Sequence, residues 1–354
     1  MISTHQKKGI AMILAAAAGI SLAGSRASAL AVSTLPFNQV VAFGDSLSDV
    51  GNLALATAGS TSVFPPPPPY DTAGEFTDGP DTTPSTSIIG VWVQQLNNNF
   101  LHDNYAGFSP LTPSLSGGTD YAFGGAITGS SSTPPGLATQ VNMFLTAHPA
   151  ASRNNLYVFW GGANDISAAA AQSNPTLAGI ETAATTAASN IDAEIQQIAN
   201  AGGKYFLWVN LPPLNLTPAA ISGGAITQDV AALATASFNT AWQADVAALN
   251  TSGVHVLGEN VNTLFTNIIG NPSAYGFTNV TTPARGQVGV NPDTYLFWGN
   301  KHPTTAADKL LARQSYNDIN TAFAVPEPAA IVLLAAGCGG ILLLHRRKNH
   351  RANS

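Results

Sequence analysis

Short apolar runs alternate with longer amphipathic stretches through the middle of the chain. Two Ala-rich stretches, 178–201 and 227–249, carry bulky apolar residues at helical spacing, and a turn containing glycine follows each of them. The short runs are rich in β-branched and aromatic residues, as buried strands are, and comprise 40–43, 120–123, 156–160, 205–209 and 254–257. Strands that alternate with helices predict an α/β fold with a parallel sheet covered on both faces.

The first apolar run stops abruptly at Gly44-Asp45-Ser46, and a helix-compatible segment, 47–58, follows it. A strand that breaks into a helix at this point would leave the Ser46 side chain at the carboxyl end of the strand, beside a helix N-terminus. This is a favourable place for a nucleophile. A purely structural interpretation is that Asp45 and Ser48 cap the helix.

The N-terminal segment has the three parts of a secretory signal peptide. Lys7-Lys8 precede an apolar run, 10–24, and Ala27-Ser28-Ala29 has the small-residue pattern of a cleavage site. We therefore expect residues 1–29 to be a signal peptide, the alternative being an N-terminal membrane anchor.

The C-terminal segment has a similar three-part organisation. Pro326-Glu327-Pro328 is followed by an apolar run, 329–344, and then by a basic cluster, 345–351. The tail 325–354 resembles the PEP-CTERM sorting signal of Gram-negative bacteria, which implies transient membrane anchoring and processing by an exosortase. The alternative is a plain C-terminal membrane anchor. Either way, the positive-inside rule places the main domain, 30–324, across the inner membrane, in the periplasm, at the cell surface or in the extracellular matrix.

The main domain is acidic once the two termini are set aside. Seven of the 13 Lys and Arg residues and one of the 19 Asp and Glu residues lie in the termini, which leaves 6 cations and 18 anions, or about −12. This balance argues against nucleic acid or anionic membrane surfaces as partners. The single cysteine, Cys338, lies in the apolar tail, and no histidine pair has ligand spacing. The sequence therefore predicts no metal site and no cofactor.

A serine nucleophile needs a base and donors aimed at the oxyanion. Of the histidines in the main domain, His302 is the best base, because it lies in a loop just before a helix expected from Thr304. His102 and His148 follow helix-like segments, and His255 lies in an apolar strand. Donors could come from two turns after strands, Gly124-Gly125 and the Asn164 side chain.

These blocks together resemble the GDSL-type, or SGNH, hydrolase family over roughly the whole main domain. The resemblance implies a three-layer α/β/α sandwich similar to flavodoxin. It also implies ester hydrolysis with Ser46 as nucleophile and His302 as base. The oxyanion hole would consist of the Ser46 and Gly125 N–H groups and the Asn164 side chain, with Gly124 as the alternative to Gly125.

One position departs from the family. The family usually has Asp three residues before the histidine, where this chain has Gly299. We therefore expect a Ser46–His302 dyad, with the imidazole held by a backbone carbonyl, by Asn300 or by Asp293. Three functions stay open: an acyl esterase or lipase, an O-deacetylase acting on exopolysaccharide, and a binding protein on the same fold.

The segment 59–87 contains five consecutive prolines and predicts a surface loop near the nucleophile. Val63, Phe64, Tyr70 and Phe76 could form an apolar wall for an acyl chain. Alternatively, they pack on the body of the loop itself.

Overall fold

The computed structural model describes residues 33–60, 64–66, 70, 73–79 and 90–326. The predicted signal peptide, and the sorting tail from residue 327 onward, lie outside the described residues. The described residues divide into two units, one containing 33–36 and 323–326 and the other containing the described part of 37–322. In the first unit, β1 (Ser33–Thr34) pairs antiparallel with β6 (Val325–Pro326). In the part of the chain described, no helix is both long enough and apolar enough to cross a membrane.

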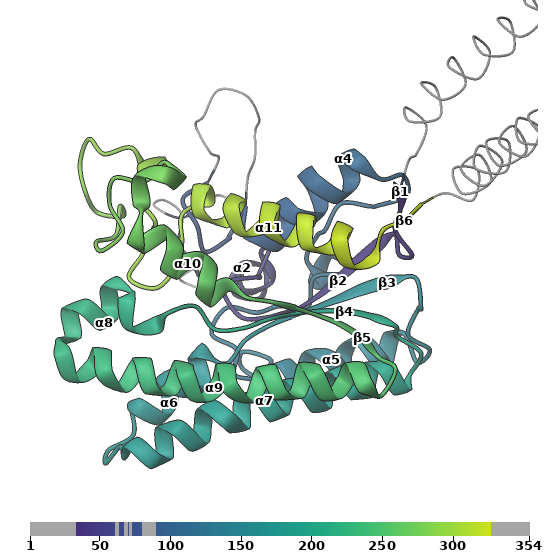
Figure 1. Cartoon of the computed structure of the whole chain (residues 1–354), viewed down its shortest axis with the longest axis horizontal. Helices are drawn as coiled ribbons and strands as arrows, with labels where there is room; N and C mark the ends of the chain where they lie inside the picture. The colour runs from purple at the N-terminus through teal and green to yellow at the C-terminus, as the bar shows by residue number, and fades with distance from the viewer. Residues whose placement is uncertain (1–32, 61–63, 67–69, 71–72, 80–89, 327–354) are drawn as a thin grey trace, which may run out of the picture. The chain divides into compact units, whose positions relative to one another are not determined.

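The second unit contains a parallel sheet in the order β2-β3-β4-β5 (Figure 1). Its strands are β2 (Gln39–Gly44), β3 (Asn155–Trp160), β4 (Tyr205–Val209) and β5 (His255–Glu259). Each adjacent pair is parallel. Four of the five predicted strands are therefore confirmed.

The fifth predicted strand, 120–123, is not a strand. It lies beside β2 through a single bridge between Ala42 and Asp120. Its backbone bonds are Tyr121 N to Ala42 O (2.7 Å) and Phe123 N to Gly44 O (3.1 Å). The Gly124-Gly125 turn follows at once, so the segment is too short to extend a ladder. It nevertheless takes the place of a strand at the edge of the sheet, beside β2. Counted in chain order, with β2 first and the 120–123 segment second, the spatial order is 2-1-3-4-5, as in flavodoxin.

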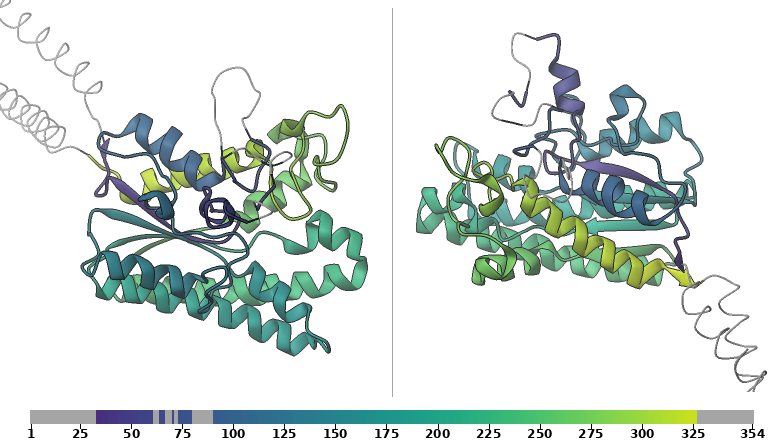
Figure 2. Two further views of the ribbon diagram at one scale, coloured as in Figure 1. Left: turned by 180° about the vertical axis from the view of Figure 1, so that it is seen from behind. Right: turned by 90° about the horizontal axis from the view of Figure 1, so that it is seen from above.

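Helices cover both faces of this sheet, as Figures 1 and 2 show. One layer contains α5 (Leu137–Ala147), α7 (Leu177–Asn200) and α9 (Ala225–Thr251), and the opposite layer contains α4 (His102–Asn104) and α11 (Thr305–Phe323). The other helices are α2 (Asn52–Thr57), α3 (Trp92–Gln95), α6 (Ala163–Ala170), α8 (Pro218–Gly223) and α10 (Val261–Gly270). The three-layer α/β/α prediction is thus confirmed.

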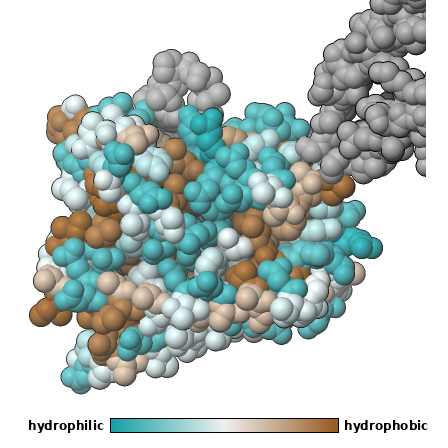
Figure 3. Space-filling model, viewed as in Figure 1, coloured by the Kyte–Doolittle hydropathy of each residue, from teal (hydrophilic) through white to brown (hydrophobic). Residues whose placement is uncertain are grey.

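The two-residue period of the strands explains why both layers form. Val41, Phe43, Phe159 and Trp208 belong to the core shared with α5, α7 and α9. The alternate strand residues, such as Ala42 and Val158, are equally buried on the other face. On the face of the molecule seen in Figure 3, apolar and polar residues are interspersed.

A buried polar side chain joins the start of α2 to the 120–123 segment. The fully buried Asn52 donates through Nδ2 to Asp120 O (2.8 Å), Asp120 Oδ2 (3.1 Å) and Ala122 O (3.0 Å). Its Oδ1 accepts hydrogen bonds from Ser114 Oγ and Leu115 N. One amide therefore satisfies several groups that water cannot reach.

We predict that Asn52→Ala lowers the free energy of unfolding by about 3 kcal/mol, because it leaves buried partners unsatisfied. Urea denaturation of the full chain measures this change. The matched control is Asn267→Ala on α10, where the side chain is exposed and the expected change is within about 0.5 kcal/mol. Equal stabilities for the two variants would contradict the role assigned to Asn52.

Candidate active site

The structure brings Ser46 and His302 together across the sheet edge. Ser46 follows β2, and His302 lies in the loop before α11. The distance from His302 Nε2 to Ser46 Oγ is 2.8 Å, a hydrogen-bond distance short enough for proton transfer between the two atoms. This pair is the centre of the candidate site.

The turn around Ser46 differs from the expected strand-to-helix break. α2 begins only at Asn52, so Ser46 does not lie beside its N-terminus. Asp49, rather than Asp45 or Ser48, caps this helix, since its carboxylate accepts from the N–H groups of Gly51, Asn52 and Leu53. Residues 47–51 are used for this turn, which is why the helix is shorter than predicted.

The strand end before the nucleophile is held from both sides. Gln140 of α5 accepts from Gly44 N and donates to Gly44 O, both at 2.9 Å. A Cβ at Gly44 would lie 2.6 Å from Trp160 O of β3, so this position has no room for a side chain. Both constraints fix where the chain turns to present Ser46.

Backbone hydrogen bonds within the loop hold the segment that carries His302. Trp298 N and Gly299 N donate to His302 O at 2.9 and 3.2 Å, and Thr304 N donates to Leu296 O at 3.1 Å. The imidazole packs against the ring of Phe76, with the centroids 5.1 Å apart. The base therefore has a defined position.

Burial sets the charge state of the base. Loss of solvation, together with the smaller effect of the positive charges of Lys301 and Arg285, lowers the pKa of His302 to about 4. His302 is therefore neutral at physiological pH and ready to accept the Ser46 proton.

No carboxylate orients His302 within the described residues. Neither Asp293 nor Asn300, the two side chains predicted for this role, forms a hydrogen bond with His302 there. Asp293 lies in a 3-10 turn, Pro292–Thr294, and Asn300 is exposed, with its carbonyl accepting from Ala219 N. In the described structure Ser46 and His302 form a hydrogen-bonded pair, and His302 Nδ1 donates no hydrogen bond to a backbone carbonyl there either.

The structure distinguishes between the two glycines proposed as oxyanion donors. Gly124 N already donates to Asp49 Oδ2 at 2.8 Å. Gly125 is exposed, has φ +81°, and its N–H has no acceptor among the described residues. The Ser46 N–H is equally unengaged in that part of the chain. Gly125 therefore suits the role better than Gly124.

Asn164 is the third predicted donor and lies in the first turn of α6. Its Nδ2 donates to Ala126 O at 2.9 Å and, more weakly, to Asp45 Oδ2 at 3.4 Å. Burial raises the pKa of Asp45 to about 7. The contact of Asp45 with Asn164 was missed from sequence, where Asp45 suggested only a helix cap.

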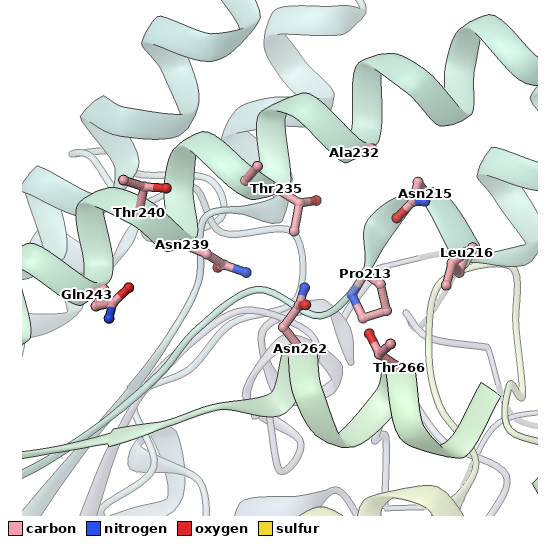
Figure 4. A pocket seen from close by; sticks show the side chains of 11 residues that line it. Pro213, Asn215, Leu216, Ala232, Thr235, Asn239, Thr240, Gln243, Asn262 and Thr266 are labelled. Carbon is pink, nitrogen blue, oxygen red and sulfur yellow. The ribbon is translucent and has the colours of Figure 1, made fainter. Parts of the chain in front are cut away.

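A separate cavity lies away from Ser46 and His302. A cavity of about 440 Å³ lies between α9 and α10, as Figure 4 shows, and amide and hydroxyl side chains such as Asn239, Thr240 and Asn262 line it. Neither Ser46 nor His302 lines this cavity. In the described part of the chain, no cluster of three or more His, Cys, Asp or Glu side chains could hold a metal ion.

A serine at the carboxyl edge of a parallel sheet, with a neutral histidine on its hydroxyl and nearby turns whose N–H groups have no acceptor among the described residues, is the arrangement expected of a serine hydrolase site. More specifically, residues 40–315 match the family model of the GDSL-like lipase/acylhydrolases. The chain belongs to this family.

Curated relatives agree with this assignment. A GDSL esterase/lipase of Arabidopsis thaliana is 30% identical over 145 residues, covering 35% of this chain and 40% of the relative. Lipase 1 of Photorhabdus luminescens is 25% identical over 365 residues, covering 82% of this chain and 51% of the relative. The chain thus spans about half the length, or less, of these relatives.

Solved structures show only distant similarity. Est24, a carbohydrate acetylesterase from Sinorhizobium meliloti, is 13% identical with a TM-score of 0.42, covering 81% of this chain and 100% of its own. The extracellular lipase of Streptomyces rimosus is 16% identical with a TM-score of 0.39, covering 80% and 99%. At this level of similarity neither structure bears on the chemistry of this chain.

We predict that the acid limb of kcat/KM for an ester substrate has an apparent pKa near 4, the value for His302, instead of the ordinary 6.5. His302 must be neutral to accept a proton, so activity is lost as the pH falls through this value. A pH profile of the full chain measures the limb. Asp45→Asn removes any contribution from Asp45 near pH 7, and a limb that stays near 6.5 in this variant would contradict the prediction.

Proposed function

We propose that this chain hydrolyses carboxylic esters, with Ser46 as nucleophile and His302 as general base. The 2.8 Å contact between His302 Nε2 and Ser46 Oγ is the observation that carries the proposal. Ser46 Oγ attacks the ester carbonyl while its proton passes to Nε2. The tetrahedral intermediate then collapses to an acyl-serine, and Nε2 returns the proton to the leaving alcohol. In the second half-reaction His302 takes a proton from water as the water oxygen attacks the acyl carbonyl, and Nε2 then returns that proton to Ser46 Oγ as the acid leaves.

The developing oxyanion would be held by the N–H groups of Ser46 and Gly125 together with Asn164 Nδ2. The first two are already unengaged in the described structure. Asn164 would exchange its weak 3.4 Å bond to Asp45 for a bond to the oxyanion, while the 2.9 Å bond to Ala126 O keeps the amide in place. The donor is thus oriented before substrate arrives.

Aromatic side chains beside the base support an apolar acyl group. Phe76 contacts His302, and its ring centroid lies 5.8 Å from that of Phe64 and 6.1 Å from that of Tyr70. Phe76 is buried, whereas Phe64 is 52% exposed. In this proposal the apolar wall begins at the buried ring of Phe76, next to His302, and ends at the exposed ring of Phe64. Val63 lies outside the described residues.

The family and the names of the curated relatives also support esterase or lipase activity, although the chain spans only part of those relatives. No observation favours the polysaccharide O-deacetylase or the binding protein over this function. We further propose, on the sequence alone, that residues 1–29 direct export across the inner membrane. We propose that residues 325–354 give transient anchoring before an exosortase processes them.

We predict that Ser46→Ala and His302→Ala each reduce hydrolysis of p-nitrophenyl butyrate at least about 10³-fold, because either change removes proton transfer to and from Oγ. The assay compares both variants with the full chain. Exposed counterparts, Ser116→Ala and His148→Ala, serve as matched controls and should keep full activity. Activity that survives in Ser46→Ala would overturn the assignment of the nucleophile.

We predict that Phe64→Ala lowers kcat/KM for p-nitrophenyl octanoate about ten-fold while leaving the acetate ester nearly unchanged. A longer acyl chain would lose contact with the exposed ring, and a buried aromatic contact is worth about 1–2 kcal/mol. Ile226, which is 81% exposed on α9, provides the control variant Ile226→Ala. Equal losses on both esters would argue against an acyl wall.

A further inference from the structure

Gly299 leaves room beside the base for a Cβ atom. A Cβ built at this position would lie 3.7 Å from His302 Nδ1 and 3.7 Å from the Tyr70 hydroxyl, both ordinary contact distances. No other atom of the described residues outside the adjoining chain lies within 4 Å of it. The backbone of Gly299 is not in the left-handed region. The position therefore faces the nitrogen that a triad carboxylate would contact.

Among the described residues, the charges that act on the imidazole beside this space are positive. The groups that act electrostatically on His302 are Lys301 and Arg285. They are two of only six cations in a main domain with 18 carboxylates. The Arg285 guanidinium also lies over the ring of Tyr70, with Cζ 5.0 Å from the centroid. Two of the few cations of an acidic domain thus act on an imidazole that has no carboxylate partner among the described residues.

We propose that a small carboxylate from solution, such as formate or acetate, binds beside Gly299 and serves as the third member of the catalytic site. This inference rests on the proposed ester hydrolysis. His302 Nδ1 and the Tyr70 hydroxyl would donate hydrogen bonds to the carboxylate, and Arg285 would supply the positive charge. Guanidinium and carboxylate groups pair well in this way.

The bound carboxylate would act without changing covalently. When Nε2 accepts the Ser46 proton, the imidazole becomes positively charged, and the adjacent anion stabilises that charge while Nδ1 keeps its own proton. Between the two half-reactions the charge disappears again as Nε2 returns the proton to the alcohol. Because ester hydrolysis releases a carboxylic acid, a short-chain product could itself occupy this site and raise the rate as it accumulates.

The experiment measures initial rates of p-nitrophenyl butyrate hydrolysis by the full chain over a concentration series of formate, acetate and butyrate, with chloride at matched ionic strength. We expect a saturable increase of at least about ten-fold with formate or acetate, smaller with butyrate and absent with chloride. The apparent pKa of the acid limb should also rise, because an anion beside Nδ1 favours the charged imidazole. An NMR titration of the His302 ring, assigned with His302→Ala, should show the same rise without any substrate.

Matched variants test where the carboxylate binds. Gly299→Asp should hydrolyse the ester faster than the natural chain and lose the response to acetate, whereas the neutral Gly299→Asn should lose the response without a gain in rate. Tyr70→Phe and Arg285→Gln should each raise the acetate concentration needed for half of the effect.

Equal effects of acetate and chloride, or an acetate response that persists in Gly299→Asp, would overturn this inference while leaving the esterase intact. Rates equal to those of Ser46→Ala in every condition, for Gly299→Asp as well, would instead reject the proposed function. An NMR pKa of His302 that acetate does not move would reject the binding site whatever the activity.

Discussion

The carboxylate of Asp49 is the group on which the geometry of the site depends. It lies fully buried and accepts hydrogen bonds from four backbone N–H groups, three at the start of α2 and one at Gly124. Burial raises its pKa to about 6, and the four donors work against that rise. One side chain thereby joins the turn after β2 to the glycine turn after residue 123. The nucleophile and its candidate oxyanion donor share a single anchor.

The same carboxylate explains why Gly125 suits the role of oxyanion donor better than Gly124. Since Asp49 binds the N–H of Gly124, the chain reverses at Gly125 and leaves the next N–H exposed. Below them, Asn52 and Asp120 satisfy the backbone of the 120–123 segment, which cannot do so as a strand. Polar groups that would be costly to bury singly are therefore stable as a connected network. The site takes its shape from this network more than from regular secondary structure.

The sequence predicted the architecture well because the hydrophobic period is strong where elements are long. It located four of the sheet strands, the helices now seen as α7 and α9, and the start of α11 within one residue. Ser46 and His302 could be paired from motif and order alone. The extent of α2 and the nature of 120–123 could not, because side-chain bonds from Asp49 and Asp120 decide them. Likewise, no pattern in the sequence indicates that Asp45 accepts a hydrogen bond from Asn164. Nor does it indicate that the N–H of Gly124 has an acceptor and that the N–H of Gly125 has none among the described residues.

Phe76 contacts both the imidazole of His302 and the aromatic side chains of Phe64 and Tyr70. Its ring packs on His302, and a Cβ at Gly124 would lie 2.4 Å from its Cζ. The same residue is the buried end of the aromatic cluster with Phe64 and Tyr70. The ring that packs on the base is therefore also part of the surface proposed to bind the acyl chain. Under the proposed function, a substitution of Phe76 would change both the acyl-binding surface and the burial of the imidazole, and with it the pKa of His302. A substitution of the exposed Phe64 would change the acyl-binding surface alone.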